Sequence, residues 1–492
     1  MSAPGTAPDT GRLVATVSRR TQRIVYGEPA PAEIADELRW TSTVDLAHVL
    51  MLLDRKLVEP AEATLLLDGI TRLRAADFRP VTGRPAPRGL YLAYEQYLIE
   101  TLGADVGGRL HTGRSRNDLK ATTTALRLRA ELVGLAGELV RLMAVLLSRA
   151  RAHRDVVMPV HTHFQAALPM TYGYYLTGVA LAVGRDLTAV TVAADELRRC
   201  PLGAGAVAGT DLPIDPARTA ALLGFAAPPA HALDAIASRD TPLRALAASV
   251  VAGLTLSRLA TDLQLWSTVE FGYVTFPDRL VSGSSAMPQK RNAFLLEHVK
   301  GRAAVATGAW TAAASATRST PFSNAIEVGT EAVGSVWPGL RAVLDAVQLA
   351  QSLVSGARPV PDRMLRGAQE GFVTATARAN RLVLAGVPFR TAHSLVGAAV
   401  RRAVAVGRTR LTGPEPDGGP PRPDPPLADL VAAQRAGGGP GAFGDAFREA
   451  RAEYGRHDAW CRATRDRLRR ADAELAAEVR AATGPSTQDG SR

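Results

Sequence analysis

Apolar residues recur at alternating steps of four and three along a segment between residues 115 and 152. The repeat runs through six leucines: Leu128, Leu132, Leu135, Leu139, Leu142 and Leu146. Such a seven-residue repeat predicts one long helix whose apolar stripe packs along other helices in a bundle. Residues 243–270 repeat the spacing through a second set of apolar positions: Ala252, Leu256, Leu259, Leu263 and Trp266.

Five segments in all combine the helical period with few helix-breaking residues: 115–152, 170–199, 243–270, 292–317 and 325–357. Helices longer than about 25 residues exceed the usual globular length and favour a large bundle or an oligomeric core. Loops marked by Gly and Pro separate the segments, and no convincing block of alternating strand residues interrupts them. The pattern predicts an all-α protein.

The chain divides into three predicted parts. Residues 1–112 form an N-terminal helical domain, residues 113–361 form the central five-helix bundle, and residues 362–492 form a smaller C-terminal domain with shorter helices. Residues 411–427 read LTGPEPDGGPPRPDPPL, a composition that predicts a mobile insertion. The tail beyond Gly484 is expected to be disordered.

The charge balance is strongly basic, with a formal net charge of +11. Such a balance raises the question of nucleic-acid binding. The arginines, however, are spread beside Asp and Glu in helical patterns, as at residues 127–131, and no basic run is interleaved with aromatic residues. We interpret the charge as a solvated basic surface that favours anionic substrates, with no nucleic-acid partner.

Cysteines and apolar runs limit the class of protein further. The two cysteines, Cys200 and Cys461, make neither a disulfide framework nor a metal motif. No stretch of about 18 uncharged apolar residues predicts a membrane span, and the N-terminus lacks a basic segment followed by an apolar one. The expectation is a cytoplasmic enzyme without a membrane partner.

Residues 283–292, GSSAMPQKRN, form the most unusual segment of the chain. A Gly, two hydroxyls, a Pro that suits a helix start, a Lys and an Asn stand in one loop before a predicted helix. The chain holds four lysines, Lys56, Lys120, Lys290 and Lys300, against 58 Lys plus Arg. A sequence that otherwise uses Arg has placed a compact ammonium in this loop, which predicts an anion site that needs a point charge.

Two further loops hold unusual polar residues. His111–Asp118 reads HTGRSRND at the predicted start of the first long helix, where Ser115, Asn117 and free backbone N–H groups suit a carboxylate. An ordinary helix cap with solvated arginines is the alternative for this loop taken alone. The third loop contains the pair His161 and His163, and such a pair can bind zinc. No third ligand cluster accompanies it, so we expect a proton-handling histidine and no metal.

Taken together, these loops resemble the aspartase/fumarase superfamily, and specifically its argininosuccinate lyase branch. The resemblance rests on residues 111–118, the segment 159–169 with its Thr-His pair, PLGAGAVAGTDLPID at 201–215 and GSSAMPQKRN at 283–292. Leu233-Asp234 with Arg239-Asp240, and GVPFRTAH at 386–393, extend it. The matching segments span roughly residues 100–405 in the expected order.

The resemblance implies a cofactor-free β-elimination that cleaves a succinyl compound and releases fumarate. It assigns Ser284 as the base that takes the Cβ proton and His163 as the group that protonates the departing nitrogen. The resemblance, with Asn324 added from the amine-binding segment, assigns substrate binding to seven residues: Ser115, Asn117, Thr162, Arg239, Lys290, Asn292 and Asn324. It also implies a homotetramer in which loops of three subunits form each site.

The chain departs from this branch in the segment after the signature helix. On an ungapped comparison, a Tyr of the branch becomes Asn324, a Gln becomes Gly329 and a Lys becomes Ala332. The substrate-contacting Ser of the branch also has no evident counterpart in residues 26–38. Each hydrogen bond to a charged group is worth about 1.5–3 kcal/mol, so a guanidinium substrate would lose much affinity.

We therefore expect elimination of fumarate from an N-succinyl compound other than argininosuccinate. Three alternatives stay open at this point. The chain is a genuine argininosuccinate lyase with an unusual amine pocket, a catalytically silent structural member of the family, or a helical nucleic-acid-binding protein indicated by its charge alone.

Overall fold

The computed structural model describes residues 15–411 and 425–484, and its long elements are helices. The N-terminal helices are α1 (Arg19–Tyr26), α2 (Pro31–Asp54), α3 (Pro60–Ala75), α4 (Arg79–Thr82), α5 (Leu90–Leu102) and α6 (Ala104–Gly107). The five long bundle helices are α7 (Arg116–Ala152), α8 (Tyr172–Glu196), α11 (Asp240–Trp266), α12 (Phe294–Thr317) and α13 (Val333–Gly356). The remaining helices are α9 (Pro216–Leu222), α10 (Ala232–Ala237), α14 (Pro361–Gln369), α15 (Ala375–Leu384), α16 (Phe389–Ala405), α17 (Leu427–Ala433) and α18 (Phe443–Thr483). The predicted insertion at 411–427 lies for the most part outside the described residues, as does the tail beyond Gly484.

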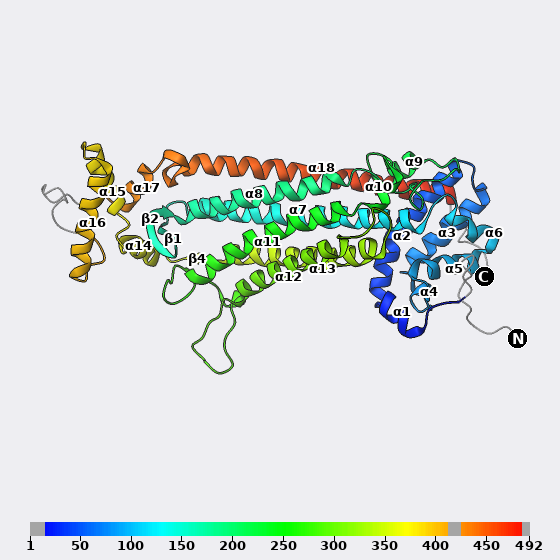
Figure 1. The fold of residues 1–492 in the computed structure, drawn as a ribbon, viewed down its shortest axis with the longest axis horizontal. Coiled ribbons are helices and arrows are strands. Elements are labelled where there is room, and N and C mark those ends of the chain that lie inside the picture. Colours follow the sequence, from blue (N-terminus) through cyan, green and yellow to red (C-terminus); the bar gives the residue numbers. More distant parts are fainter. Residues whose placement is uncertain (1–14, 412–424, 485–492) are drawn as a thin grey trace, which may run out of the picture.

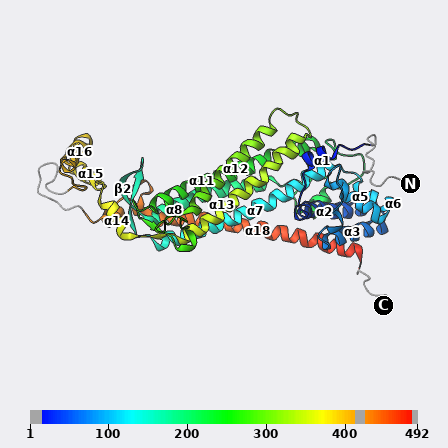
Figure 2. The same cartoon turned by 90° about the horizontal axis from the view of Figure 1, so that it is seen from below.

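The bundle runs along the length of the molecule (Figure 1). The helices α2–α6 cover one of its ends, which we call the α7-start end, and α14–α16 lie beyond the other end, which we call the hairpin end (Figures 1 and 2). The prediction of an all-α fold built on five long helices is confirmed.

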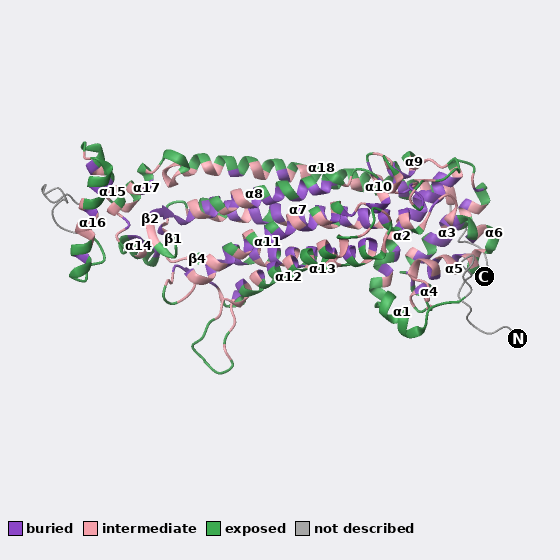
Figure 3. Cartoon of the chain, in the orientation of Figure 1, coloured by how far each residue is buried: buried purple, intermediate pink, exposed green. Residues whose placement is uncertain are grey.

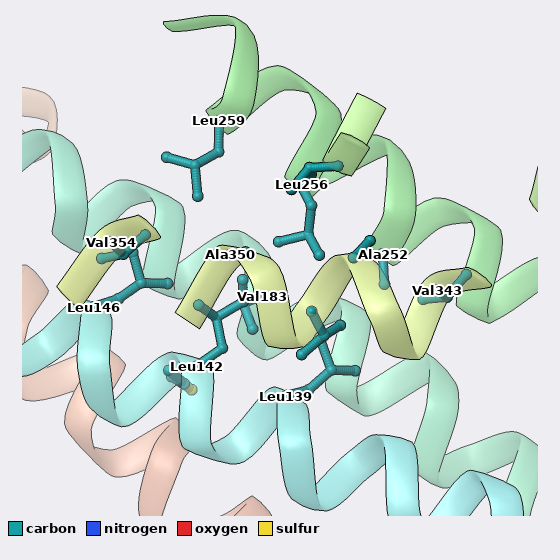
Figure 4. Close-up of a cluster of buried hydrophobic side chains, with 14 of the residues drawn as sticks. Leu139, Leu142, Leu146, Val183, Ala252, Leu256, Leu259, Val343, Ala350 and Val354 are labelled. Atoms are coloured by element: carbon teal, nitrogen blue, oxygen red, sulfur yellow. The ribbon is translucent and has the colours of Figure 1, made fainter. Parts of the chain in front are cut away.

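The leucine repeat forms the centre of the bundle core. All six repeat leucines of α7 are at most 2% exposed, and the apolar repeat of α11 is buried with them. Leu139, Leu142 and Leu146 of α7 face Leu256 and Leu259 of α11 and Ala350 of α13 across the close-up in Figure 4. This burial of a continuous apolar stripe is what stabilises helices of such length.

The C-terminal region has the expected shorter helices in α14–α17, but the expectation fails for its last helix, α18. Helix α18 has 41 residues and runs back along α7 and α8 toward α3 (Figure 1). Its Ala450 and Cys461 join the bundle core, whereas Leu475 and Val479 join a second core formed by the N-terminal helices. One helix thus links both cores, and the division at residues 112 and 361 stays a prediction.

A β-hairpin stands where a loop was expected. Strands β1 (Val157–Thr162) and β2 (Gln165–Thr171) pair antiparallel between α7 and α8, and the short strands β3 (Val274–Thr275) and β4 (Arg358–Pro359) pair nearby. Pro159 lies opposite Pro169 in the ladder. Two prolines within a short segment indicated a loop, because proline has no backbone N–H to donate to a strand ladder.

Helices α8 and α11 are long and apolar enough to cross a membrane by length and composition. Core helices pass the same test, and about half of each apolar stretch is buried within the fold. Helix α8 packs against α7 and α11, and helix α11 packs against α8 and α13. The bundle core therefore accounts in part for the apolar composition of both helices.

Candidate active site

The start of α7 holds two of the predicted substrate-binding residues. Ser115 caps the helix, and its hydroxyl accepts a hydrogen bond from the Asn117 backbone N–H at 3.2 Å. The Asn117 side-chain amide donates to the Ala206 carbonyl at 3.1 Å. Both side chains are half-buried at a helix N-terminus, where the helix dipole and unpaired N–H groups favour an anion.

Asp118 fastens this helix start to the loop that follows α8. One carboxylate oxygen accepts from the backbone N–H groups of Ser115 and Leu119, at 2.9 and 3.0 Å. The other oxygen accepts from Gly203 and Gly205, at 3.1 and 2.9 Å. Four donors converge on a side chain that has no exposed surface. The geometry of Ser115 and Asn117 therefore depends on Asp118.

A buried ion pair supports the same loop from the N-terminal helices. The guanidinium of Arg114 lies 2.6 Å from the Asp45 carboxylate of α2, and neither side chain is exposed. Arg114 also donates to the Tyr91 hydroxyl at 3.1 Å. Burial raises the pKa of Asp45, and the adjacent Arg114 acts against that rise. Removal of either partner would leave an uncompensated buried charge.

Arg239 precedes α11 at the same end of the bundle. Its guanidinium donates to the carbonyls of Ile236 and Ser238, both at 2.7 Å, and its Nε is buried without a hydrogen bond in the described structure. Burial lowers the pKa of Arg239 to about 10. An arginine that is 7% exposed and lines a cavity of about 210 Å³ retains capacity for an anion.

Asn324 lies in the segment between α12 and α13, also at the α7-start end. The π-helical turn Glu327–Ala332 follows it, and the Lys120 ammonium of α7 donates to the Thr330 hydroxyl in that turn at 2.6 Å. Gly329 and Thr330 line a hollow of about 760 Å³, whereas Ala332 is 2% exposed and does not line it. Of the three replaced positions, Asn324 and Gly329 are therefore the ones available to a ligand.

The hairpin end carries Thr162 and His163. His163 and Phe164 form the two-residue turn between β1 and β2, and both have a positive φ, 52° and 61°. Positive φ at both central positions is typical of the tight hairpin turn, but it is uncommon for residues other than Gly and Asn. The turn holds His163 exposed at the tip, beside exposed Thr162.

His161, the other member of the histidine pair, has a different environment. Its ring packs against Phe271 and Tyr273, and burial lowers its pKa. The two histidines therefore do not form a common metal site. No cluster of three or more His, Cys, Asp or Glu suited to a metal ion occurs among the described residues.

Residues 282–292 form a closed loop that projects from the hairpin end (Figure 1). Ser282 and Asn292 exchange backbone hydrogen bonds at 2.9 and 2.8 Å, and Arg291 pairs with Asp278 at 2.5 Å. Helix α12 begins at Phe294, close to the predicted start at residue 292, and Pro288 lies within the loop before it. The loop is exposed along most of its length (Figure 3).

The Ser284 hydroxyl is held inside this loop. Its Oγ accepts from the backbone N–H groups of Met287 and Ala286, at 3.1 and 3.3 Å. Two amide donors directed at one hydroxyl oxygen favour its deprotonated form. Lys290 is exposed on the same loop, and the Asn292 side-chain amide donates to the Gly283 carbonyl at 3.4 Å.

The predicted site residues fall into two groups within one chain. Ser115, Asn117, Arg239 and Asn324 lie at the α7-start end, while Thr162, His163, Ser284, Lys290 and Asn292 lie at the hairpin end (Figures 1 and 2). Helix α7 spans the distance between them with 37 residues, which corresponds to about 55 Å. A single chain does not bring the two groups together.

The supporting residues Asp118, Asp45 and Arg114 were not predicted as functional. Asp118 could have been found from sequence, because a Ser followed three residues later by an acidic residue is a helix-cap signature. Asp45, whose carboxylate pairs with Arg114, could not have been found from the sequence, because it lies far from Arg114 in sequence on a helix with no unusual pattern.

Comparisons with known proteins identify the family of the chain. The family described as "Lyase" matches residues 86–308, and "Argininosuccinate lyase C-terminal" matches residues 372–414. The argininosuccinate lyase of Methanoculleus marisnigri is 37% identical over 371 residues, 74% of this chain and 75% of the relative. That of Methanosarcina acetivorans is 35% identical over 398 residues, 80% of this chain and 78% of the relative.

Solved structures extend the likeness to three dimensions. An EDDS lyase variant with bound fumarate has a TM-score of 0.84 at 26% identity, over 92% of this chain and 93% of that one. The class II fumarase of Schistosoma mansoni, at 14% identity and a TM-score of 0.66 over 76% and 85% of the two chains, shares the fold alone.

The bundle of long helices and the projecting loop 282–292, together with these matches, define the protein as an all-α lyase. The chain belongs to the argininosuccinate lyase branch of the aspartase/fumarase superfamily. Its enzyme class is that of the carbon–nitrogen lyases.

Proposed function

We propose that the protein cleaves the C–N bond of an N-succinyl compound by β-elimination and releases fumarate and an amine. The observation that carries the proposal is the Ser284 hydroxyl, whose oxygen accepts from two backbone amides in the projecting loop. A serine is a weak base unless its anion is stabilised, and these donors supply that stabilisation.

In the proposed reaction Ser284 takes the proton from the carbon next to a carboxylate. The electron pair left on that carbon spreads into the carboxylate, and the resulting charge must be stabilised for the reaction to proceed. Lys290 and Asn292 on the same loop, with Thr162, Ser115 and Asn117, are proposed to bind the two succinyl carboxylates. The compact, strongly hydrated ammonium of Lys290 suits a point contact with such an anion.

His163 is proposed to protonate the nitrogen as the C–N bond breaks. Its exposed position at the hairpin tip leaves the imidazole available to a neighbouring subunit. Imidazole is the side chain best suited to exchange protons near neutral pH, which this role requires.

The site is proposed to form between subunits of a homotetramer. One chain holds its two groups of site residues at ends about 55 Å apart, so different chains must supply them. Helices α11 and α12 offer an apolar contact surface, since Val251, Leu254 and Val305 are each about half exposed. Contiguous exposed apolar side chains of this kind mark protein–protein contacts.

We propose that the amine half differs from arginine. Asn324 and Gly329 stand where the branch has Tyr and Gln, and Gly329 lines the hollow at the α7-start end. Argininosuccinate itself is the second candidate substrate, because the relatives at 35–37% identity are named argininosuccinate lyases.

Incubation of the purified protein with argininosuccinate and with a panel of other N-succinyl amines tests both candidates, with fumarate followed by its ultraviolet absorbance. We expect fumarate from at least one other N-succinyl amine and little from argininosuccinate. Turnover of argininosuccinate at an ordinary enzymatic rate would refute the different amine half. Absence of fumarate from every compound would refute the lyase function and favour a silent structural member of the family.

A further inference from the structure

The hollow at the α7-start end adjoins the proposed carboxylate-binding residues. Lys120 follows Asn117 by three residues, which places the two side chains on neighbouring positions of the α7 surface. Arg127, which also lines the hollow, lies ten residues beyond Asn117, or about 15 Å along the helix. The hollow is thus long enough to receive a substituent that extends away from the succinyl group.

Lys120 is the lysine that lines this hollow, and the proposed reaction does not use it. Its Nζ lies 2.6 Å from the Thr330 hydroxyl, at the point where α7 meets the turn before α13. A hydroxyl does not neutralise an ammonium, and no ion pair between Lys120 and a carboxylate occurs in the described structure. Burial lowers the pKa of Lys120, and Glu37 opposes that effect.

The position of this ammonium is informative because a lysine of the branch becomes Ala332 here on the ungapped comparison. Ala332 lies two residues from Thr330 and is itself buried. The turn Glu327–Ala332 thus has no lysine of its own, and an ammonium from α7 contacts it instead.

The charged residues of the lining leave an excess of positive charge, since Glu28 and Glu37 stand against five cations: Arg19, Arg23, Arg84, Lys120 and Arg127. Arg127 lies over the Trp337 ring, 4.3 Å from its centroid, and Arg84 is paired with Glu100. Glu37 is the acidic residue between Lys120 and Arg127, and both cations act to lower its pKa against the effect of burial. One carboxylate faces two cations, which leaves room for a second anion.

On the basis of the proposed function, we infer that Lys120 determines specificity by binding a carboxylate on the leaving amine, from the first turns of α7. The protein would then select amines that carry an acidic group next to the nitrogen, as amino acids do, over the same amines without it. Arg127 and Trp337 border the space for the remainder of the amine.

The test runs the reaction toward C–N bond formation, with fumarate and matched pairs of amines. The amine nitrogen adds to one alkene carbon of fumarate, the other carbon takes a proton, and the nitrogen loses one. Suitable pairs are L-phenylalanine with 2-phenylethylamine and L-leucine with 3-methylbutylamine, because the members of each pair differ only in the carboxylate and each has a single amine. The loss of fumarate absorbance gives kcat/KM for each amine.

We expect the carboxylate-bearing member to react about 10- to 100-fold faster at low amine concentration, the range that a charged hydrogen bond provides. Lys120→Met should abolish that preference by raising KM for the amine, without changing KM for fumarate. Lys56→Met, which removes an exposed lysine elsewhere, is the matched control.

A variant that moves the lysine to the contacting position separates loss of recognition from loss of folding. Lys120→Thr combined with Thr330→Lys exchanges the two contacting groups across the hollow, so it should restore much of the preference that Lys120→Thr alone loses. Equal rates within each pair, reaction of only the carboxylate-free members, or a change in fumarate KM would overturn the inference. Absence of reaction with every amine and every N-succinyl compound would instead be a failure of the lyase function, and the inference would fall with it.

Discussion

Ser284 and Ser285 are adjacent in sequence, but they differ in burial and in hydrogen bonding. Ser284 is half-buried and accepts from two backbone N–H groups, whereas Ser285 is exposed and has no hydrogen bond in the described structure. The sequence could nominate the pair, and the resemblance could nominate the first member. The amide donors that favour Ser284 as the proposed base depend on the local turn, which no sequence pattern reveals.

Ser284→Ala should lower kcat by about 10²–10⁴-fold, the range expected for loss of a general base. Ser285→Ala should change kcat by less than about threefold, because its hydroxyl has no comparable donors. Steady-state fumarate release by both variants measures the difference. A larger loss in Ser285→Ala would contradict our assignment of the base.

His163→Asn should lower kcat by about 10²–10⁴-fold while the melting temperature stays close to that of the parent protein. Asparagine tolerates the positive φ of 52° at this position, so the turn should persist without the imidazole. Thermal unfolding and fumarate release together check the prediction. An active His163→Asn variant would remove the imidazole from the mechanism.

At the scale of elements, the long bundle helices could be predicted from the sequence, whereas the β1–β2 hairpin and helix α18 could not. The leucine repeat of α7 predicts a buried stripe because burial follows directly from the period of the helix. The hairpin was missed because prolines interrupt its pattern, and α18 was missed because its mostly polar sequence packs only at separated positions such as Ala450 and Cys461. The hairpin and α18 both depend on packing between residues far apart in sequence, which the local pattern does not reveal.

Asp118→Ala should lower the free energy of unfolding by about 2–4 kcal/mol, because buried backbone donors lose their acceptor. It should also lower kcat/KM, since Ser115 and Asn117 lose their anchor. Asp68→Asn, which removes an exposed acid paired with Arg72, should change stability by less than about 0.5 kcal/mol. Urea unfolding of both variants is the measurement, and an equal effect of the two changes would contradict the anchoring role.

The histidines beside the α7 start should make the protein sensitive to acid. Burial, with a contribution from Arg114, lowers the pKa of His111 from 6.5 to about 4, and the same two causes lower the pKa of His48 well below its usual value. Between pH 6.5 and 4 the unfolded chain binds protons that the folded chain does not bind, so stability should fall as pH falls through this window.

Urea midpoints measured across that window check the prediction. A His48→Gln/His111→Gln double variant should show a shallower loss of stability with falling pH than the parent protein, whatever its stability at pH 7. An unchanged slope would mean that other groups cause the acid sensitivity.

At the scale of the whole molecule, the distance between the two groups of site residues is the decisive feature. The sequence identified both groups through the resemblance, but it could not show that one chain holds them about 55 Å apart along α7. Only the fold gives that separation, and the separation requires shared sites if the residues act together.

Complementation between two inactive variants tests the central claim most directly. Asn117→Ala carries its lesion at the α7-start end and Ser284→Ala at the hairpin end, and each variant alone should release little fumarate. After the two are unfolded together and refolded as mixed tetramers, about a quarter of the sites should receive both intact groups, so activity should return to about a quarter of the parent level. Mixed tetramers that stay as inactive as the separate variants would contradict a fumarate-releasing site assembled from opposite ends of different chains.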